Sequence, residues 1–467
     1  MITNNVSVVN CSNRLDRLPI SKVHRTVLFA LAFVYFFDYS DLNTFAYAAP
    51  ALIKSWDISV QTIALITSMS FLGMFLGSFM GGRLADRIGR KKAMIYMVIL
   101  FSLFSLLNAI AWNPLSLGIF RFFTGMGVAA VTVIAGTYIT EFFPSAKRGR
   151  YQALCVTFGL IGIPITSWVS RLLIPTGPEG WRFVFVWGAL GILSLFFIRK
   201  IEESPRWYEI CGEFDKAEVA LKKIESSVIQ EKGSLSSPAI SKDTRIVAAA
   251  PFTSLFKGKC MKRTLLLIGV WILQTFGFYG FGSWAPTLLV KNGMDIEKTL
   301  TIATLFAIGA PLGAFIGSLV SDRFERKWTI TITSVIVAIS GLLYGLTFNP
   351  IFIVTFGFLL NLIERVFSSN LYAYTSELYP TELRASGTGL TYGVGRLSNM
   401  VGPMLISFIF TGYGYFSVFV FISLCWLAVA ITVGIFGPFT KDKGLEDLNI
   451  DDTEKSSAVE IDLKVRL

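Results

Sequence analysis

The chain has 467 residues; 53% of them are hydrophobic, only 16% are charged, and the mean hydropathy is +0.61. Soluble domains usually carry about 25% charged residues, so this composition excludes an ordinary soluble protein. The net charge of +11 comes from Lys and Arg residues spread over loops between apolar runs, which indicates contact with an anionic membrane leaflet and not with nucleic acid.

Apolar runs of about 20 residues, the length that crosses a bilayer, follow one another along the chain. They lie at roughly 26–53, 61–81, 93–112, 115–139, 151–174, 183–199, 264–290, 299–320, 328–347, 351–375, 386–410 and 414–437. The sequence therefore predicts an all-α polytopic membrane protein with twelve transmembrane helices in two six-helix halves, 26–199 and 263–438.

Three polar segments complete the predicted organisation. The segment 1–25 lacks the apolar core of a signal peptide, and we expect it to be a cytoplasmic N-terminal segment. The segment 439–467 is expected to be a cytoplasmic tail. The central loop 200–262 contains an amphipathic helical pattern that we expect to lie along the membrane or under the two halves. Its apolar face would consist of Phe214, Ala217, Leu221 and Ile224.

Lysine and arginine are concentrated in the loops that follow even-numbered predicted helices. These residues are Arg83, Arg87, Arg90, Lys91 and Lys92 after the second helix, Lys147, Arg148 and Arg150 after the fourth, Arg323, Arg326 and Lys327 after the eighth, and Arg384 after the tenth. Loops after odd-numbered helices hold few such residues or none. The positive-inside rule then places both termini in the cytoplasm, and we expect the membrane to be the plasma membrane.

One charged loop occurs twice. Residues 81–91 read GGRLADRIGRK and residues 317–327 read GSLVSDRFERK, so that Asp322 lies 236 positions after Asp86. The same offset relates a second set of residues, Glu141, Pro144 and Arg148, to Glu377, Pro380 and Arg384. This repetition indicates a tandem duplication, and two like halves of membrane helices are the architecture of transporters that rock about a central site.

The repeated loops predict a gate at the cytoplasmic face. Asp86 and Asp322 are expected to accept hydrogen bonds from the N-terminus of a facing helix, where the helix dipole is positive. Glu141 should lie close to Arg87 or Arg90, and Glu377 close to Arg323 or Arg326, with Arg148 and Arg384 completing the network. The glycines of the loops, Gly81, Gly82 and Gly317, should allow close contact between helices.

Three motifs carry a resemblance to a known superfamily. They are Gly82-x-x-x-Asp86-Arg87-x-Gly89-Arg90-Lys91 between helices 2 and 3, Arg121-x-x-x-Gly125-x-Gly127 in helix 4, and Glu203-Ser204-Pro205-Arg206-Trp207 after helix 6. The chain thereby resembles the major facilitator superfamily over essentially its whole length. The resemblance implies alternating access to a cavity lined by helices 1, 4, 7 and 10.

Two further segments resemble a subgroup of metabolite:proton symporters that includes aromatic acid and niacin-type transporters. They are Phe37-Asp38-Tyr39-Ser40-Asp41 in helix 1, and Tyr279-Gly280 with Trp284-x-Pro286 in helix 7. Ser40 replaces a glycine of the subgroup, and Val131 and Val133 stand where niacin-like relatives have an acidic residue and a proline. Helix 7 has the single amide Gln274 where hexose porters carry more, so amide groups for sugar recognition are missing there.

Charged residues within the predicted spans need a functional reason, because burying a charge in a bilayer is costly. Asp38 and Asp41 share one helical face in helix 1 and, with Glu364, are candidates for proton coupling. Arginine matches a carboxylate through two hydrogen bonds, which makes Arg396 the first candidate for binding an anionic substrate and Arg121 the second. Three further residues are expected at the substrate, Tyr279, Trp284 and Gln274. A purely structural alternative for Glu364 is an ion pair with its neighbour Arg365.

Together these features predict a secondary active transporter that takes up a small organic anion, an aromatic or short carboxylic acid, with protons. Two alternatives stay open, a sugar:proton symporter and a proton-coupled exporter of apolar compounds. The expected partners are the substrate, protons and the lipid bilayer, and the expected functional unit is a monomer.

Enzymatic and metal-dependent activities are not expected. The sequence has no catalytic constellation and no nucleotide-binding Walker motif. Its five cysteines form no C-x-x-C pair, so neither a disulfide framework nor a metal site is predicted, and no cofactor is expected.

Overall fold

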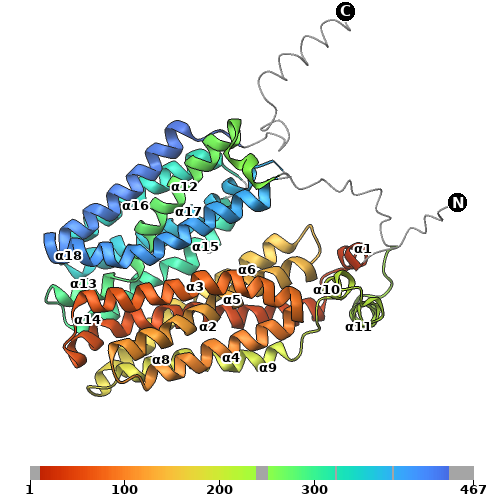
Figure 1. Cartoon of the computed structure of the whole chain (residues 1–467), viewed down its shortest axis with the longest axis horizontal. Helices are drawn as coiled ribbons and strands as arrows, with labels where there is room; N and C mark the ends of the chain where they lie inside the picture. Colours follow the sequence, from red (N-terminus) through yellow and green to blue (C-terminus); the bar gives the residue numbers. More distant parts are fainter. Residues whose placement is uncertain (1–10, 238–250, 321–322, 381–382, 441–467) are drawn as a thin grey trace, which may run out of the picture.

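The computed structural model of the protein describes residues 11–237, 251–320, 323–380 and 383–440 (Figure 1). Every regular element in these ranges is a helix, which confirms the predicted all-α class. In this part of the chain, ten helices are long and apolar enough to span a membrane. Helix α2 (Lys22–Trp56) has 35 residues and adds a span, and α18 (Arg384–Phe436) holds two spans in 53 residues because it turns at Gly414.

The other membrane helices follow the order of the predicted runs. Unbroken spans are α3 (Val60–Ile88), α4 (Arg90–Ala109), α5 (Pro114–Phe142), α16 (Arg326–Leu346) and α17 (Pro350–Glu377). Broken spans are α6 (Arg148–Leu160) with α7 (Gly162–Leu173), α8 (Trp181–Ala189) with α9 (Ser194–Ile198), α12 (Gly258–Gly282) with α13 (Ala285–Lys291), and α14 (Ile296–Ala307) with α15 (Gly309–Val320). Helix α13 starts anew because Pro286 lacks the N–H that would continue α12.

The duplication is visible in how the helices pack. A Cβ added to Gly73 or Gly77 of α3 would lie 1.9 or 2.0 Å from a backbone oxygen of α5. At the offset of 236, a Cβ on Gly309 or Gly313 of α15 would lie 2.5 or 2.1 Å from a backbone oxygen of α17. Only glycine permits such close backbone contact, so both halves use small residues to join the same pair of helices.

The expectation for the loop glycines is correct for two of three. A Cβ on Gly81 would meet Ala130 at 2.7 Å, and one on Gly317 would meet Ser369 at 2.7 Å. By contrast, a Cβ on Gly82 would meet nothing within 4 Å, because the position lies on an outer face of α3.

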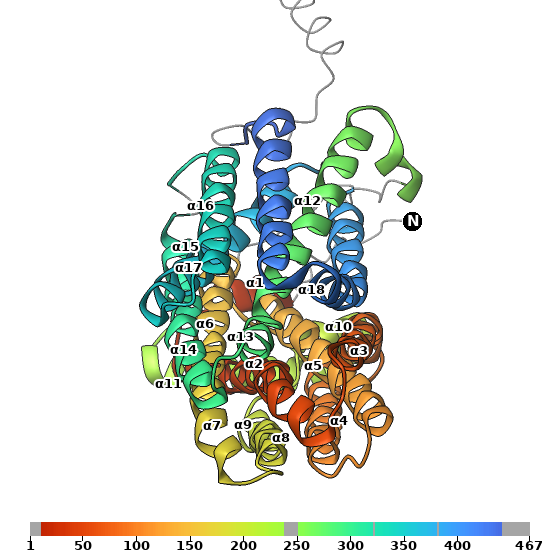
Figure 2. The ribbon, with the colours of Figure 1, turned by 90° about the vertical axis from the view of Figure 1, so that its left-hand side faces the viewer.

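The two halves meet through α2, α3, α6 and α7 on one side and α13, α14, α15 and α18 on the other (Figures 1 and 2). Three polar contacts join them at the end that we call the far end, opposite to the basic loop 83–92. Ser167 donates to the carbonyl of Leu300 at 3.2 Å and accepts from Thr304 at 3.1 Å, and Arg171 lies 3.7 Å from Glu297.

The opposite end, called the basic end, carries the short helices α1 (Cys11–Asp16) and α10 (Pro205–Ile210) and the longer α11 (Phe214–Lys232). Ion pairs fasten α1 to α11, since Arg14 lies 2.5 Å from Glu218 and 2.6 Å from Glu225. The hydrogen bond from Arg14 lowers the pKa of Glu218. Helix α11 buries the predicted residues Ala217, Leu221 and Ile224, whereas Phe214, at its first position, is 67% exposed.

Candidate functional site

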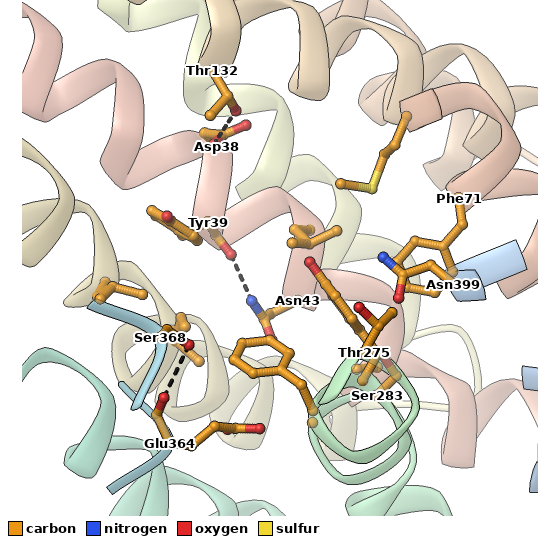
Figure 3. Close-up of a pocket in the computed structure, with 18 of the residues that line it drawn as sticks. Asp38, Tyr39, Asn43, Phe71, Thr132, Thr275, Ser283, Glu364, Ser368 and Asn399 are labelled. Carbon is orange, nitrogen blue, oxygen red and sulfur yellow. Dashed lines mark hydrogen bonds between the residues drawn. The ribbon is translucent and has the colours of Figure 1, made fainter. Parts of the chain in front are cut away.

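A cavity of about 600 Å³ lies between the two halves (Figure 3). Its walls include residues of α2, α3 and α5 from the N-terminal half and of α12, α17 and α18 from the C-terminal half. The first, fourth, seventh and tenth predicted spans, which are α2, α5, α12 and α17, all contribute. Aromatic side chains supply much of the surface, among them Tyr35, Tyr39, Phe71, Trp271, Phe278 and Tyr279.

Asp41 and Arg121 form an ion pair inside the N-terminal half. The Nη1 atom of Arg121 lies 3.6 Å from Oδ2 of Asp41, and both side chains are almost fully buried. Ser105 donates a hydrogen bond to Oδ1 of Asp41, and Nε of Arg121 donates to Ser70 at 3.2 Å. Arg121 lines the cavity, whereas Asp41 does not, so the guanidinium lies between this carboxylate and the cavity.

Asp38 occupies a different environment from Asp41, although the two lie less than one helical turn apart. It lines the cavity, and its Oδ2 atom accepts a hydrogen bond from Thr132 of α5 at 2.9 Å (Figure 3). Its Oδ1 atom is buried without a hydrogen-bond partner. Asp38 therefore presents an unsatisfied acceptor beside the cavity, whereas Asp41 is held by α4 and α5.

Arg396, on the first span of α18, lines the cavity from the C-terminal half. Its Nε atom donates to the hydroxyl of Tyr392 at 2.9 Å, and its guanidinium lies 5.0 Å from the centroid of that ring. Its Nη1 atom is buried without a hydrogen-bond partner, and the described residues place no carboxylate in an ion pair with it. Asn399, one turn along α18, also faces the cavity (Figure 3).

Glu364 and Arg365 are neighbours on α17 and both line the cavity. No ion pair joins them in the described structure, because successive residues of a helix point in different directions. The guanidinium of Arg365 instead lies 4.5 Å from the centroid of Phe278, and its Nε atom has no hydrogen-bond partner. The Oε1 atom of Glu364 is likewise buried without a partner. The structure thus does not support the purely structural ion pair.

Of the three remaining substrate candidates, two line the cavity and one does not. Tyr279 lines the cavity and meets the edge of Phe71 with 5.0 Å between ring centroids. Gln274 also lines it and donates to the hydroxyl of Thr275 at 2.9 Å. Trp284 is buried in the hydrophobic core and is not among the residues of the cavity wall.

Amide side chains are more numerous in the cavity than helix 7 alone suggests. They are contributed by α2, α6, α12, α17 and α18, and comprise Asn43, Gln152, Gln274, Asn361 and Asn399. Sequence reasoning missed four of them because they lie on separate spans, where a lone amide carries no pattern.

The repeated loop forms an ion-pair network at the basic end of the N-terminal half. Arg90 binds Glu141 with Nε at 3.1 Å and Nη2 at 2.8 Å, and Nη2 also lies 3.0 Å from Asp86. Of the two arginines expected near Glu141, the fold thus selects Arg90. Arg87 is exposed, and Arg148 begins α6 without an ion pair in the described residues.

The C-terminal half repeats part of this network. Nη1 of Arg326 lies 2.9 Å from Glu377, which matches Arg90 and Glu141 at the offset of 236. Asp322 lies outside the described residues. Arg323 is the first described residue after Asp322, and Arg384 is the first residue of α18. The ion pairs Arg90–Glu141 and Arg326–Glu377 each lie within one half.

Comparison with known protein families identifies the family to which this chain belongs. The family model described as "Sugar (and other) transporter" matches residues 23–451. The chain belongs to this family of transporters.

This transporter is similar along its whole length to several known proteins. It is 55% identical to YyaJ of Bacillus subtilis (strain 168), which carries the name of a metabolite transport protein, over 93% of this chain and 96% of that one. It is 30% identical to the niacin transporter NiaP of Acinetobacter baylyi, over 94% of this chain and 99% of that one. The crystal structure of a D-xylose-proton symporter shares its fold, with a TM-score of 0.71 at 16% identity, over 90% of this chain and 100% of that one.

In this transporter, the segment after the sixth span takes a structural role that its sequence motif did not reveal. The carboxylate of Glu203 accepts hydrogen bonds from the backbone N–H of Lys91 at 3.0 and 3.1 Å, at the start of α4. We expected Asp86 to bind a helix N-terminus, and Glu203 does so instead. Ser204 donates to Glu141 at 2.5 Å, and Trp207 donates to the carbonyl of Asp86 at 2.8 Å.

Proposed function

We propose that this transporter carries a small organic anion, an aromatic or short carboxylic acid, into the cell together with protons. The observation that carries the proposal is Arg396, a cavity-wall guanidinium that is held by Tyr392 and lacks a carboxylate partner in the described structure. A planar guanidinium binds a carboxylate through two parallel hydrogen bonds, and Nη1 of Arg396 has no partner to displace.

The walls of the cavity support an aromatic cargo. Phe71 and Tyr279 come from opposite halves and contact each other edge to face, so together they offer the cavity a joint aromatic surface on which a flat ring could pack. The similarity to a niacin transporter also supports a ring acid.

Three carboxylates are proposed to carry the coupled protons. Asp41 is paired with Arg121, and arrival of an anion near Arg121 would weaken that pair and favour protonation of Asp41. Asp38 and Glu364 face the cavity, each with a buried oxygen that has no partner, and protonation would remove a costly buried charge from either.

The proposed orientation assigns the basic end to the cytoplasm and the far end to the outside of the plasma membrane. On this orientation the contacts of Ser167 with Leu300 and Thr304 would close the outer side, which supports an inward-facing state.

We further propose that the repeated loops gate the cytoplasmic side. The pairs Arg90–Glu141 and Arg326–Glu377 each hold a loop against its own half, and closure would require the two loops to approach each other. Asp86→Asn removes one partner of Arg90 and should slow transport and shift the protein further toward inward-facing, as labelling of a cysteine in the inner cavity would report. An unchanged rate with unchanged labelling would contradict gating by this residue.

A second candidate function, sugar:proton symport, is favoured by the amide side chains of the cavity. Amides donate to and accept from hydroxyl groups, and Gln274, Asn361 and Asn399 all belong to the C-terminal wall. Unpaired arginines are less useful for a neutral sugar than for an anion, so we place this candidate second.

The deciding experiment compares ligands on the purified protein. Benzoate-like acids, short organic acids and hexoses are titrated by calorimetry against the wild type and Arg396→Lys, which keeps the charge but loses the planar fork. We expect acid binding that weakens roughly tenfold or more in the variant, since ~1.4 kcal/mol corresponds to tenfold. Arg83→Lys, a change at an exposed arginine beside Phe79, serves as the control. Hexose binding that survives Arg396→Lys, without any acid binding, would overturn the proposal.

A further inference from the structure

We propose that the cavity is suited to a dianion, a dicarboxylic acid whose two carboxylates are bound separately by Arg396 and Arg365 while its body lies against Tyr279. The inference rests on the proposed function, because it assumes that Arg396 binds an acid. It adds a second anchor, Arg365, and a narrower class of substrate.

The first observation is that the C-terminal wall holds two arginines with similar surroundings. Arg365 of α17 and Arg396 of α18 line the same cavity, and in the described residues neither forms an ion pair with a carboxylate. Each has one buried nitrogen without a hydrogen-bond partner, Nε in Arg365 and Nη1 in Arg396. Arg121, the third arginine of the wall, is neutralised by Asp41.

The second observation is that aromatic rings hold both guanidiniums in place. Arg365 lies over Phe278, which in turn meets Tyr279 with 4.9 Å between ring centroids. Arg396 is fixed by the hydroxyl and the ring of Tyr392. Tyr279 lines the same cavity as both arginines. An aromatic ring carries no net charge, so it leaves the positive charge of the guanidinium uncompensated, whereas a carboxylate partner would neutralise it.

The third observation concerns the balance of charge. Asp38 and Glu364 are the cavity-wall carboxylates outside the Asp41–Arg121 pair, and each leaves a buried oxygen unbonded. When both carry a proton, two positive charges remain on the wall. One dicarboxylate neutralises both, whereas a monocarboxylate leaves one cation buried without a partner, which is unfavourable. The same balance implies two protons carried inward with each dianion.

The test measures binding of matched acids to the full-length purified protein. Benzoate is compared with the three benzenedicarboxylates, and butyrate with succinate. For the wild type, we expect at least one dicarboxylate to bind tenfold or more tightly than its matched monocarboxylate. In Arg365→Gln this advantage should disappear, while monocarboxylate affinity changes less than twofold. In Arg396→Lys both kinds of acid should bind more weakly.

Controls keep the two proposals distinguishable. Arg83→Gln removes an arginine outside the cavity and should leave the ratio of affinities unchanged. If Arg365→Gln does not fold, Arg365→Lys, which keeps the charge without the fork, should give a reduced ratio. Equal binding of mono- and dicarboxylates by the wild type would overturn the inference, and so would an equal loss for both acids in Arg365→Gln. Absence of any acid binding would instead refute the proposed function itself.

Discussion

Replacing Asp41 by Asn is the sharpest perturbation of the buried ion pair in the N-terminal half. Asparagine keeps an oxygen that can accept the hydrogen bond from Ser105, but it removes the charge that faces Arg121 at 3.6 Å. Arg121 is then left buried with Ser70 as its hydrogen-bond partner. The variant therefore tests both the stability of this half and the proposed coupling of transport to protons.

The separation of the charges sets the expected magnitude. At 3.6 Å and an effective dielectric constant of about 20, the attraction is about 4–5 kcal/mol. Measured losses on breaking a buried pair from one side are of similar size, about 3–5 kcal/mol. Removing Arg121 as well, in Asp41→Asn/Arg121→Gln, should restore part of the loss, with a coupling free energy of about 1–3 kcal/mol.

Two assays read the outcome. Denaturation of the purified protein in detergent gives the stability of the single and double variants. Proteoliposomes with an imposed pH gradient give accumulation and exchange, and we expect Asp41→Asn to exchange substrate but not to concentrate it. Asp57→Asn is the matched control, since Asp57 is exposed and its left-handed backbone (φ 48°) suits asparagine.

Either of two results would refute this reasoning. Concentration of substrate by Asp41→Asn at the wild-type level would show that another group couples transport to protons. Unchanged stability of the variant would show that Arg121 does not depend on this carboxylate for its burial.

Three further results are expected. Gly89→Ala should destabilise the protein by about 1–3 kcal/mol in denaturation, because φ is 96° and the new Cβ would lie 2.4 Å from Glu203, whereas Gly82→Ala, inside α3 with open space around it, should not destabilise it. Ser167→Cys/Thr304→Cys, with the native cysteines replaced, should stop vesicle transport on oxidation and recover on reduction. Burial raises the pKa of Cys11 to about 11, so maleimide should label it far more slowly than Cys211 at pH 8, and its stabilising contribution should be lost between pH 9 and 11.

Comparable labelling rates for Cys11 and Cys211 would contradict the burial of the α1 thiol. Transport that continues after proven cross-linking of the far end would contradict its opening during the cycle. A loss of stability in Gly82→Ala equal to that in Gly89→Ala would show that neither the left-handed backbone of Gly89 nor its contact with Glu203 explains the effect.

Several features of the site could be foreseen because they depend on local pattern. Apolar runs of membrane length and a motif repeated at one offset are properties of the chain itself, and they lead directly to two like halves. The same offset of 236 relates glycine contacts that were not foreseen. Gly73 of α3 packs on α5 as Gly309 of α15 packs on α17.

Partner choice could not be foreseen to the same degree. Glu141 had two candidate arginines, and only the direction in which α4 leaves Gly89 brings Arg90 to it. Glu203 is more than a hundred residues from Lys91 in the chain, so its bond to the start of α4 depends on the path of the segment after the sixth span.

The sequence by itself determined the membrane class, the duplication and the set of charges that must be buried, because length, hydropathy and repetition are read residue by residue. Tertiary structure decided what each charge faces. Asp38 and Asp41 share one helical face, so the sequence predicts the same proton-coupling role for both. In the fold, residues of α4 and α5 bind Asp41, whereas Asp38 borders the cavity. An ion pair of Arg365 with its neighbour Glu364 was one of two alternatives, and the fold turns Arg365 onto Phe278 instead. Contacts between helices far apart in the chain have no local signal, and they alone determine which charges are neutralised within the protein and which are left for a ligand.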